Sequence, residues 1–284
     1  KNELPTWRGH HEQNMALTGI AYSRAKRRKQ IFIATSSVGP GSTNMLTAAA
    51  VAMSNRLPML FLPGDTYANR MPDPVLQQVE HFNNPNITQN DAFKYVTRYF
   101  DRITRPEQIL QTLPHAIQTM IDPSDCGPAC ISLSQDVQGE TFDYPEEFFK
   151  EKIHTIRRPR PDDYQIKQAA DLIKKSKNPI IISGGGIFYS DAMKELSQFA
   201  KKHNIPTAQT VMGYSTMKKD DPYFLGAIGG FGGKAPNDFM KKTDLAIAIG
   251  TKLADFTTGS WANFENPNFK LVSINAARFD ANKH

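Results

Sequence analysis

Short apolar segments alternate along this chain with segments of helical pattern, and this alternation does most to limit the folds open to it. Between the apolar segments, hydrophobic residues recur every three or four positions, as on one face of a helix. Strands that alternate with amphipathic helices predict parallel sheets covered by helices on both faces. We therefore expect an α/β fold with strands near residues 31–35, 58–62, 129–133, 179–182, 205–208, 245–249 and 271–274.

A polar stretch from 141 to 163 interrupts this alternation. Arginines alternate with prolines from 157 to 161, which favours an extended backbone. The helical pattern then restarts, with Asp162 or Asp163 as its N-cap. A length of 284 residues suits about two domains. We expect two consecutive domains with parallel sheets flanked by helices: a first domain over 1–150, a linker over 151–162 and a second domain over 163–284.

Several local patterns lead to further expectations about secondary structure. A helix is expected over 12–25, and another from Ser42 or Thr43, as N-cap, through residue 53. Residues 95–96 read as a short strand. Pro114 is expected to begin a second helix after the one opened at Pro106, because a proline inside a helix costs about 3 kcal/mol.

Composition excludes several classes of protein. The longest purely apolar stretches, 48–53 and 245–249, are far shorter than the ~20 residues that a bilayer span needs. The net charge is +6, but the basic residues collect at the end of a helix and in the linker, and no recognition-helix or zinc-finger pattern occurs. We expect neither a membrane nor a nucleic acid as partner.

The two cysteines, Cys126 and Cys130, suit a protein of the reducing cytoplasm, and we expect both to be small buried side chains. The chain has no initiator Met. It begins at Lys1 and stops at His284, just after a predicted strand, so we expect a piece of a longer protein.

Three local features could carry chemistry, and each also has a structural interpretation. Gly184, Gly185 and Gly186 stand between a strand and a helix, as in a phosphate-binding turn, or as in a tight turn that needs positive φ. The turn at 39–41, Gly-Pro-Gly, lies where ligands bind in open α/β sheets. Glu12 is either a functional carboxylate or an acid that stabilises the first turn of a helix.

Taken in order, the features of the first half resemble the pyrimidine-binding domain of thiamine diphosphate enzymes, in their acetolactate-synthase branch. The resemblance lies in residues 11–13 (His-Glu-Gln), the strand 31–35, the segment 36–44 with its Gly-Pro-Gly, and the strand 58–62. It implies a partial pyrimidine-binding domain that lacks its first residues. Residues from about 163 resemble the Rossmann-like central domain of the family, and the diphosphate-binding domain is absent.

The resemblance implies thiamine diphosphate as cofactor, with Glu12 as the catalytic residue that shares a proton with N1′ of the aminopyrimidine. Gly39, Pro40 and Gly41 would approach the ring closely, and Asn44 would support that turn. Burial must then raise the pKa of Glu12 more than the helix N-terminus lowers it.

The family holds Mg²⁺ in the absent diphosphate-binding domain. Gly64-Asp65 with Asn83-Asn84 looks like that magnesium motif, but Asp65 is followed by Thr66 instead of glycine, and Asn83 comes too soon. The pair also lies in the wrong domain. We expect no metal-binding residue in this chain.

Residues 66–78 and 99–108 look most like one family member, which hydrolyses a C–C bond of a cyclic 1,2-dione in myo-inositol catabolism and yields 5-deoxy-glucuronate. This implies a small cyclic dione as substrate. Sites shared between subunits imply a homodimer or tetramer, and a chain inactive by itself. Two alternatives stay open: an acetolactate-synthase-like ligase or 2-oxoacid decarboxylase, and a non-catalytic FAD- or ADP-binding module built on 184–186.

Overall fold

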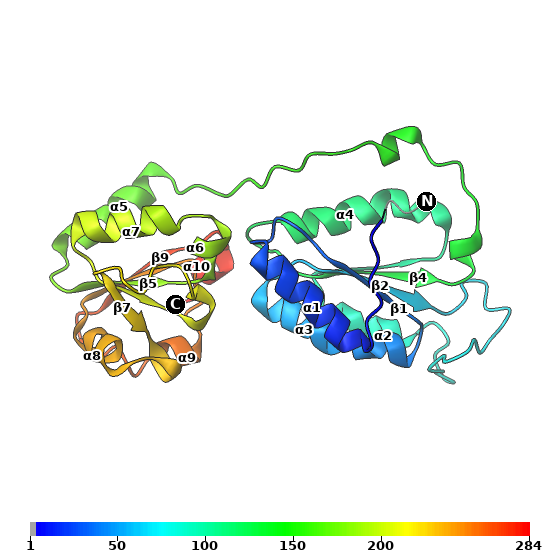
Figure 1. The fold of residues 1–284 in the computed structure, drawn as a ribbon, viewed down its shortest axis with the longest axis horizontal. Coiled ribbons are helices and arrows are strands. Elements are labelled where there is room, and N and C mark those ends of the chain that lie inside the picture. The colour runs from blue at the N-terminus through cyan, green and yellow to red at the C-terminus, as the bar shows by residue number, and fades with distance from the viewer. Residues whose placement is uncertain (1–3) are drawn as a thin grey trace. The chain divides into compact units, whose positions relative to one another are not determined.

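The computed structural model describes residues 4–284 and shows two compact units, which the chain enters in succession (Figure 1). The first unit ends at Arg157 and the second begins at Arg158. No regular secondary structure forms from 150 to 162. The arginine–proline alternation accounts for this at residues 157–161, because proline disfavours helix in the residue before it.

The first unit contains a parallel sheet whose strands lie in the order β1-β2-β4-β3. In Figure 1, α4 covers one face of this sheet, and α1 and α3 lie on the other. The elements of this unit are β1 (Ile33–Ser36), β2 (Leu60–Asp65), β3 (Tyr99–Ile103), β4 (Ala129–Ser134), α1 (Glu12–Ala25), α2 (Pro40–Asn44), α3 (Leu46–Asn55), α4 (Ile109–Ile121) and the 3-10 helices Gln89–Tyr95, Pro106–Gln108, Val137–Gly139 and Glu146–Phe149.

Apolar side chains fill both faces of this sheet. On one face, Phe61 and Phe93 are fully buried with their ring centroids 5.7 Å apart. On the other, Ile131 of β4 packs with Ala116 and Met120 of α4. Burial on both faces is what a parallel sheet between helices requires.

The second unit contains a five-stranded parallel sheet in the order β7-β6-β5-β8-β9. Its first helix begins as expected at an aspartate, because Asp162 accepts a hydrogen bond from the backbone N–H of Gln165 at 2.8 Å. The elements are β5 (Pro179–Ser183), β6 (Thr207–Gln209), β7 (Phe224–Ala227), β8 (Leu245–Ile249), β9 (Lys270–Ile274), α5 (Asp163–Lys175), α6 (Gly185–Tyr189), α7 (Met193–His203), α8 (Lys234–Lys242), α9 (Asp255–Thr258), α10 (Arg278–Ala281) and the 3-10 helices Val211–Gly213 and Gly229–Phe231.

The expected α/β fold with parallel sheets is confirmed, but three local predictions are wrong. Residues 95–96 are not a strand: the 3-10 helix ends at Tyr95, and β3 begins at Tyr99. Pro114 lies inside α4, whose buried face against the sheet compensates for the hydrogen bond that proline cannot donate. Neither Ser42 nor Thr43 is an N-cap, because α2 begins at Pro40 and both hydroxyls donate to the Gly39 carbonyl.

Burial of the two cysteines is confirmed. Both are free and buried, and burial raises the pKa of Cys126 to about 11.

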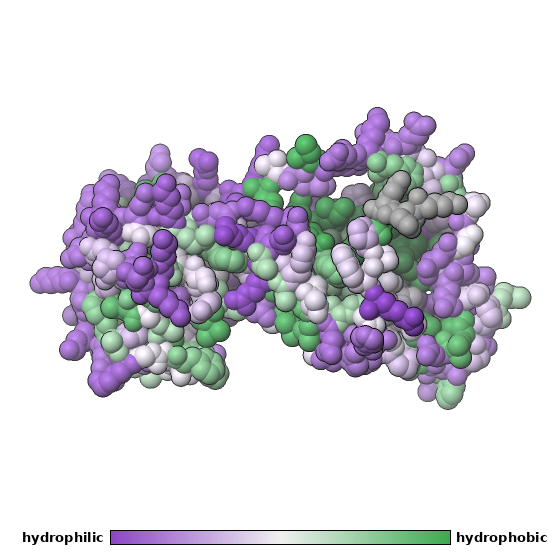
Figure 2. All heavy atoms as spheres, in the orientation of Figure 1, coloured by the Kyte–Doolittle hydropathy of each residue, from purple (hydrophilic) through white to green (hydrophobic). Residues whose placement is uncertain are grey.

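Within residues 4–284, no helix combines the length and apolar character that a membrane crossing requires. Figure 2 shows a face that is largely hydrophilic, with smaller apolar areas between the polar side chains.

Candidate active site

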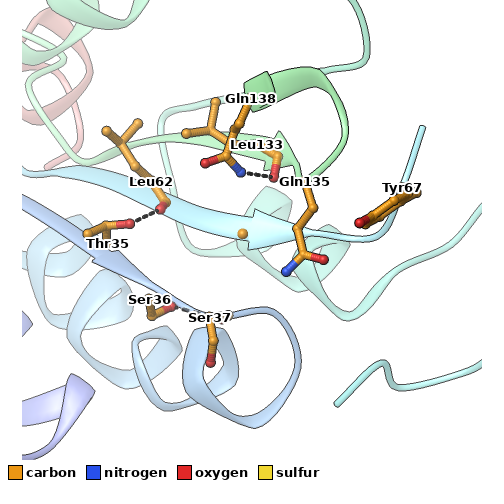
Figure 3. Close-up of a pocket in the computed structure, with 9 residues that line it drawn as sticks. Thr35, Ser36, Ser37, Leu62, Tyr67, Leu133, Gln135 and Gln138 are labelled. Atoms are coloured by element: carbon orange, nitrogen blue, oxygen red, sulfur yellow. Dashed lines mark hydrogen bonds between the residues drawn. The ribbon is translucent and has the colours of Figure 1, made fainter. Parts of the chain in front are cut away.

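A cavity of about 460 Å³ opens at the carboxyl ends of β1, β2 and β4 (Figure 3). Open α/β sheets bind ligands at this edge, because the loops that follow neighbouring parallel strands meet there. Hydroxyl and amide side chains dominate the lining, which consists of Thr35, Ser36, Ser37, Leu62, Gly64, Tyr67, Leu133, Gln135 and Gln138.

Backbone carbonyls hold several of the lining side chains in place. Thr35 Oγ1 donates to the carbonyl of Leu62 at 2.8 Å, and Gln138 Nε2 donates to that of Leu133 at 3.2 Å (Figure 3). These bonds tie side chains from separate segments to the ends of the strands. The cavity therefore has a polar wall whose geometry the sheet determines.

Glu12 lies at the start of α1, beside this cavity but not in its lining. The helix begins here because His11, in extended conformation, accepts a hydrogen bond from the backbone N–H of Gln13 through Nδ1 at 3.2 Å. The Glu12 side chain is half-buried, and its Oε2 accepts a hydrogen bond from Asn44 Nδ2 at 3.0 Å. Two residues that are 32 positions apart in sequence are thus in contact.

Gly41 lies directly against the Glu12 carboxylate. A Cβ atom at Gly41 would be 3.3 Å from Glu12 Oε1 and only 2.5 Å from Ser37 Oγ. Ser37 lines the cavity, so this glycine lies between the carboxylate and the cavity wall. Because residue 41 is glycine, it has no side chain that could cover the Oε1 atom of Glu12.

The remaining predicted residues flank this group. Gly39 has a φ of +75°, and a Cβ there would lie 1.9 Å from the backbone oxygen of Gln77, so both conformation and space require glycine. Pro40 is exposed as the first residue of α2, where its missing N–H has no helical partner to lose. The structure therefore brings Glu12, Gly41 and Asn44 together, with Gly39 and Pro40 in the adjoining turn.

The electrostatic environment of Glu12 differs from the one that the proton-sharing role requires. The hydrogen bond from Asn44 is the largest influence and lowers the pKa of Glu12, and the backbone N–H of Glu12 lowers it further. Burial acts in the opposite direction but is outweighed. In this chain the carboxylate form of Glu12 is favoured.

The glycine turn at 184–186 is required for close packing and not for positive φ. Gly184 has a φ of −111°, so the tight-turn interpretation is wrong about the backbone conformation. A Cβ at Gly184 would lie 2.3 Å from the Gly250 carbonyl oxygen, and one at Gly186 would lie 2.6 Å from Gly250 Cα. The N–H groups of Gly184 and Gly186 already donate to the carbonyls of Ile249 and Gly250, which leaves them unavailable to a phosphate.

Asp65, the acid of the magnesium-like pattern, is the buried partner of an arginine. Its side chain is 0% exposed, and its Oδ2 accepts hydrogen bonds from Arg102 Nε at 2.7 Å and Ser132 Oγ at 2.6 Å. Arg102 also binds Asp91 at 3.0 Å. Sequence reasoning missed this network, and an acid at the end of a buried strand was the one signal for it. Among residues 4–284, no group of three or more His, Cys, Asp or Glu side chains could hold a metal ion.

Comparison with known families matches both units. Residues 1–85 match the domain described as "Thiamine pyrophosphate enzyme, N-terminal TPP binding domain", and residues 166–284 match "Thiamine pyrophosphate enzyme, central domain". The chain belongs to the thiamine pyrophosphate enzymes. The cofactor of this family is the thiamine diphosphate named above.

Curated relatives within this family are similar over nearly the whole chain. Three of them are named 3D-(3,5/4)-trihydroxycyclohexane-1,2-dione hydrolase. They come from Clostridium botulinum, Clostridium tetani and Clostridium perfringens, at 47%, 48% and 46% identity. Each alignment covers 99% of this chain but 44% of the relative. The chain thus spans less than half the length of these thiamine pyrophosphate enzymes.

Proposed function

We propose that this chain is part of a thiamine diphosphate-dependent hydrolase that cleaves a C–C bond of 3D-(3,5/4)-trihydroxycyclohexane-1,2-dione. The observation that supports this most is 46–48% identity, over almost the entire chain, to relatives of that name. Residues 1–150 would form the pyrimidine-binding domain, 151–162 the linker and 163–284 the central domain. The catalytic and cofactor-binding residues would be Glu12, Gly39, Pro40, Gly41 and Asn44.

The residues at the start of α1 and α2 fit an aminopyrimidine ring. A ring nitrogen needs a carboxyl partner, and Glu12 offers Oε1 on the side where Gly41 has no side chain. Asn44 occupies Oε2, so it orients the carboxylate and leaves the other oxygen for the proton shared with the ring. When bound, thiamine diphosphate supplies a carbon nucleophile that adds to a carbonyl group of the substrate.

Glu12 must hold a proton more readily than it does in this chain by itself. Because desolvation raises the pKa of a carboxyl group, a second subunit that covers the site would supply the missing burial. We therefore propose a homodimer or tetramer in which Mg²⁺ and the diphosphate are held by a domain outside this chain. The chain alone would then be inactive.

The alternatives differ in how they fit the site. An acetolactate-synthase-like ligase or a 2-oxoacid decarboxylase would use Glu12 in the same way, so only substrate trials separate them from a dione hydrolase. Turnover of pyruvate without cleavage of the dione would favour these alternatives. An FAD- or ADP-binding module at 184–186 has less support, because two of the N–H groups in that turn are already bonded.

The decisive substitution is Glu12→Gln in the protein that contains this chain. It keeps the shape of the side chain but removes the acid, so we expect turnover of the dione to fall by about 100-fold or more. The matched control is Glu195→Gln, which removes an exposed first-turn acid from α7 and should leave turnover within about twofold. Equal turnover in both variants would mean that Glu12 only stabilises its helix.

A further inference from the structure

Gln89 joins two series of hydrogen bonds, one that ends at Asp65 and one that ends at Gly39. Its Nε2 donates to Ser42 Oγ at 2.8 Å and to Asn90 Oδ1 at 2.9 Å. An amide nitrogen carries two hydrogens, so these bonds use both. Because Gln89 belongs to the 3-10 helix Gln89–Tyr95 and Ser42 to α2, the first bond links two separate elements.

The first series of hydrogen bonds ends at the buried carboxylate of Asp65. Asn90 Nδ2 donates to Ser132 Oγ at 2.7 Å, and Ser132 Oγ donates to Asp65 Oδ2 at 2.6 Å. Arg102 pairs with the same carboxylate at 2.7 Å, and an ionised carboxylate only accepts. Because the Asp65 carboxylate can only accept, Ser132 must donate to it, Asn90 must donate to Ser132, and Gln89 must donate to Asn90. Asn90, Ser132 and Asp65 are all fully buried, so water cannot replace these partners.

The second series of hydrogen bonds ends at Gly39, the residue before α2. Ser42 is buried and its Oγ donates to the Gly39 carbonyl at 3.0 Å, which leaves the oxygen free to accept from Gln89. A helix of one turn, such as α2, has no stability of its own, so tertiary contacts must hold it in place. Asn44, at the end of the same helix, donates to Glu12.

We propose that Gln89 is a positioning residue that holds α2 in the orientation at which Asn44 engages Glu12. Because Asn90 must accept from it, the Gln89 side chain presents its amide nitrogen, which also donates to Ser42. Ser42 in turn donates to the Gly39 carbonyl in the Gly39–Gly41 turn. This keeps Glu12 Oε1 uncovered for a ring nitrogen, and in that respect the inference rests on the proposed function. A carboxylate at position 89 could not replace the amide, because it has no hydrogen to donate to Ser42 or Asn90.

Cofactor affinity tests this role without recourse to turnover. Two variants, Gln89→Glu and Ser42→Ala, are made in the protein that contains this chain. Their affinities are compared with those of the unsubstituted protein for two ligands: thiamine diphosphate, and an analogue with carbon in place of N1′. We expect both variants to bind thiamine diphosphate about tenfold more weakly, as for one lost hydrogen bond. Affinity for the analogue should stay within about twofold, since the analogue offers Glu12 no nitrogen. The control Gln111→Glu, on an exposed position of α4, should change neither affinity.

Two other binding results would overturn the proposal. Unchanged affinity for thiamine diphosphate would show that α2 needs no support from Gln89, and an equal loss for both ligands would show a merely structural role. Should Gln89→Glu fail to fold by circular dichroism, Ser42→Ala decides, because it only removes one hydroxyl. Glu12→Gln separates this proposal from the proposed function. If Glu12→Gln does not weaken the binding of thiamine diphosphate more than that of the analogue, the proposed function fails. If Glu12→Gln weakens the binding of thiamine diphosphate selectively but Ser42→Ala does not, only the positioning role of Gln89 fails.

Discussion

At the scale of single residues, the guanidinium of Arg102 lies between the carboxylates of Asp65 and Asp91. Burial by itself would lower the pKa of Arg102, but hydrogen bonds and charge from Asp65 and Asp91 raise it. Burial likewise tends to raise the pKa of Asp91, but hydrogen bonds from Lys94 and Arg102 lower it. Arg102 and Asp91 are thus both favoured in their charged forms.

Removal of this guanidinium should destabilise the first unit severely. Arg102→Ala leaves Asp65 buried without its counter-ion, and we expect a loss of about 3 kcal/mol or more in the free energy of unfolding. The measurement is urea denaturation at neutral pH. The control is Lys150→Ala, which breaks an exposed pair with Glu147 and should cost less than about 1 kcal/mol.

The same variant should alter the dependence of stability on pH. A carboxyl group whose pKa is lowered in the folded state stabilises the fold above its unfolded pKa, and this contribution disappears as the pH falls through the folded value. Asp91 is such a group, so the parent protein should lose stability on acidification and Arg102→Ala should lose less. Parallel pH profiles of the two proteins would contradict this assignment.

At the scale of elements, the second unit depends on a close approach between the end of β5 and the end of β8. Gly184 and Gly186 touch Gly250, whose own φ is +62°. No side chain fits between these backbones. The glycine-rich turn therefore contributes to the packing of neighbouring strands in the sheet.

Gly184→Ala tests this packing. Its new Cβ would lie 2.3 Å from a backbone oxygen, so we expect a destabilisation of about 1–3 kcal/mol, measured by thermal unfolding. The control is Gly139→Ala, where nothing lies within 4 Å of the new Cβ, and the change should be within about 0.5 kcal/mol. Equal melting temperatures in the two variants would show that the turn tolerates a side chain.

At the scale of the whole molecule, the chain forms two units that each have their own sheet and core. The boundary falls between Arg157 and Arg158, in a segment without regular secondary structure. In the second unit, α5 packs Ala169, Leu172 and Ile173 against a core that includes Ile181 and Ile247. These contacts all lie within residues 158–284, which predicts independent folding.

Residues 158–284 produced separately should therefore unfold cooperatively, as followed by circular dichroism on heating. A shorter segment, 179–284, keeps all five strands but lacks α5. It should not show a cooperative transition, because part of the sheet face that α5 and α7 cover together is then exposed. A cooperative transition in the shorter segment would mean that α5 is dispensable. Its absence in both would mean that the second unit depends on the first.

Elements with a regular apolar pattern could be predicted from the sequence because the pattern is local. The helix Glu12–Ala25 and the strand Leu245–Ile249 have the expected bounds. The helix has apolar residues at helical spacing, and the strand is a short uninterrupted apolar run. The edge strand β7 was not predicted. It contains Gly226 at a φ of +107°, and its pairing with β6 includes a register shift, so it depends on its neighbour more than on its own residues.

The alternation of strands and helices, the family and the candidates from Glu12 to Asn44 can therefore be inferred from the sequence alone. Which side chains are in contact depends on the tertiary fold, which joins Asn44 to Glu12, Gln89 to Ser42 and Asp65 to Arg102. The physical reason is that a period in sequence reports which face of an element is apolar. Contacts between residues tens of positions apart depend on how the sheet orders its strands, and no local pattern encodes that order.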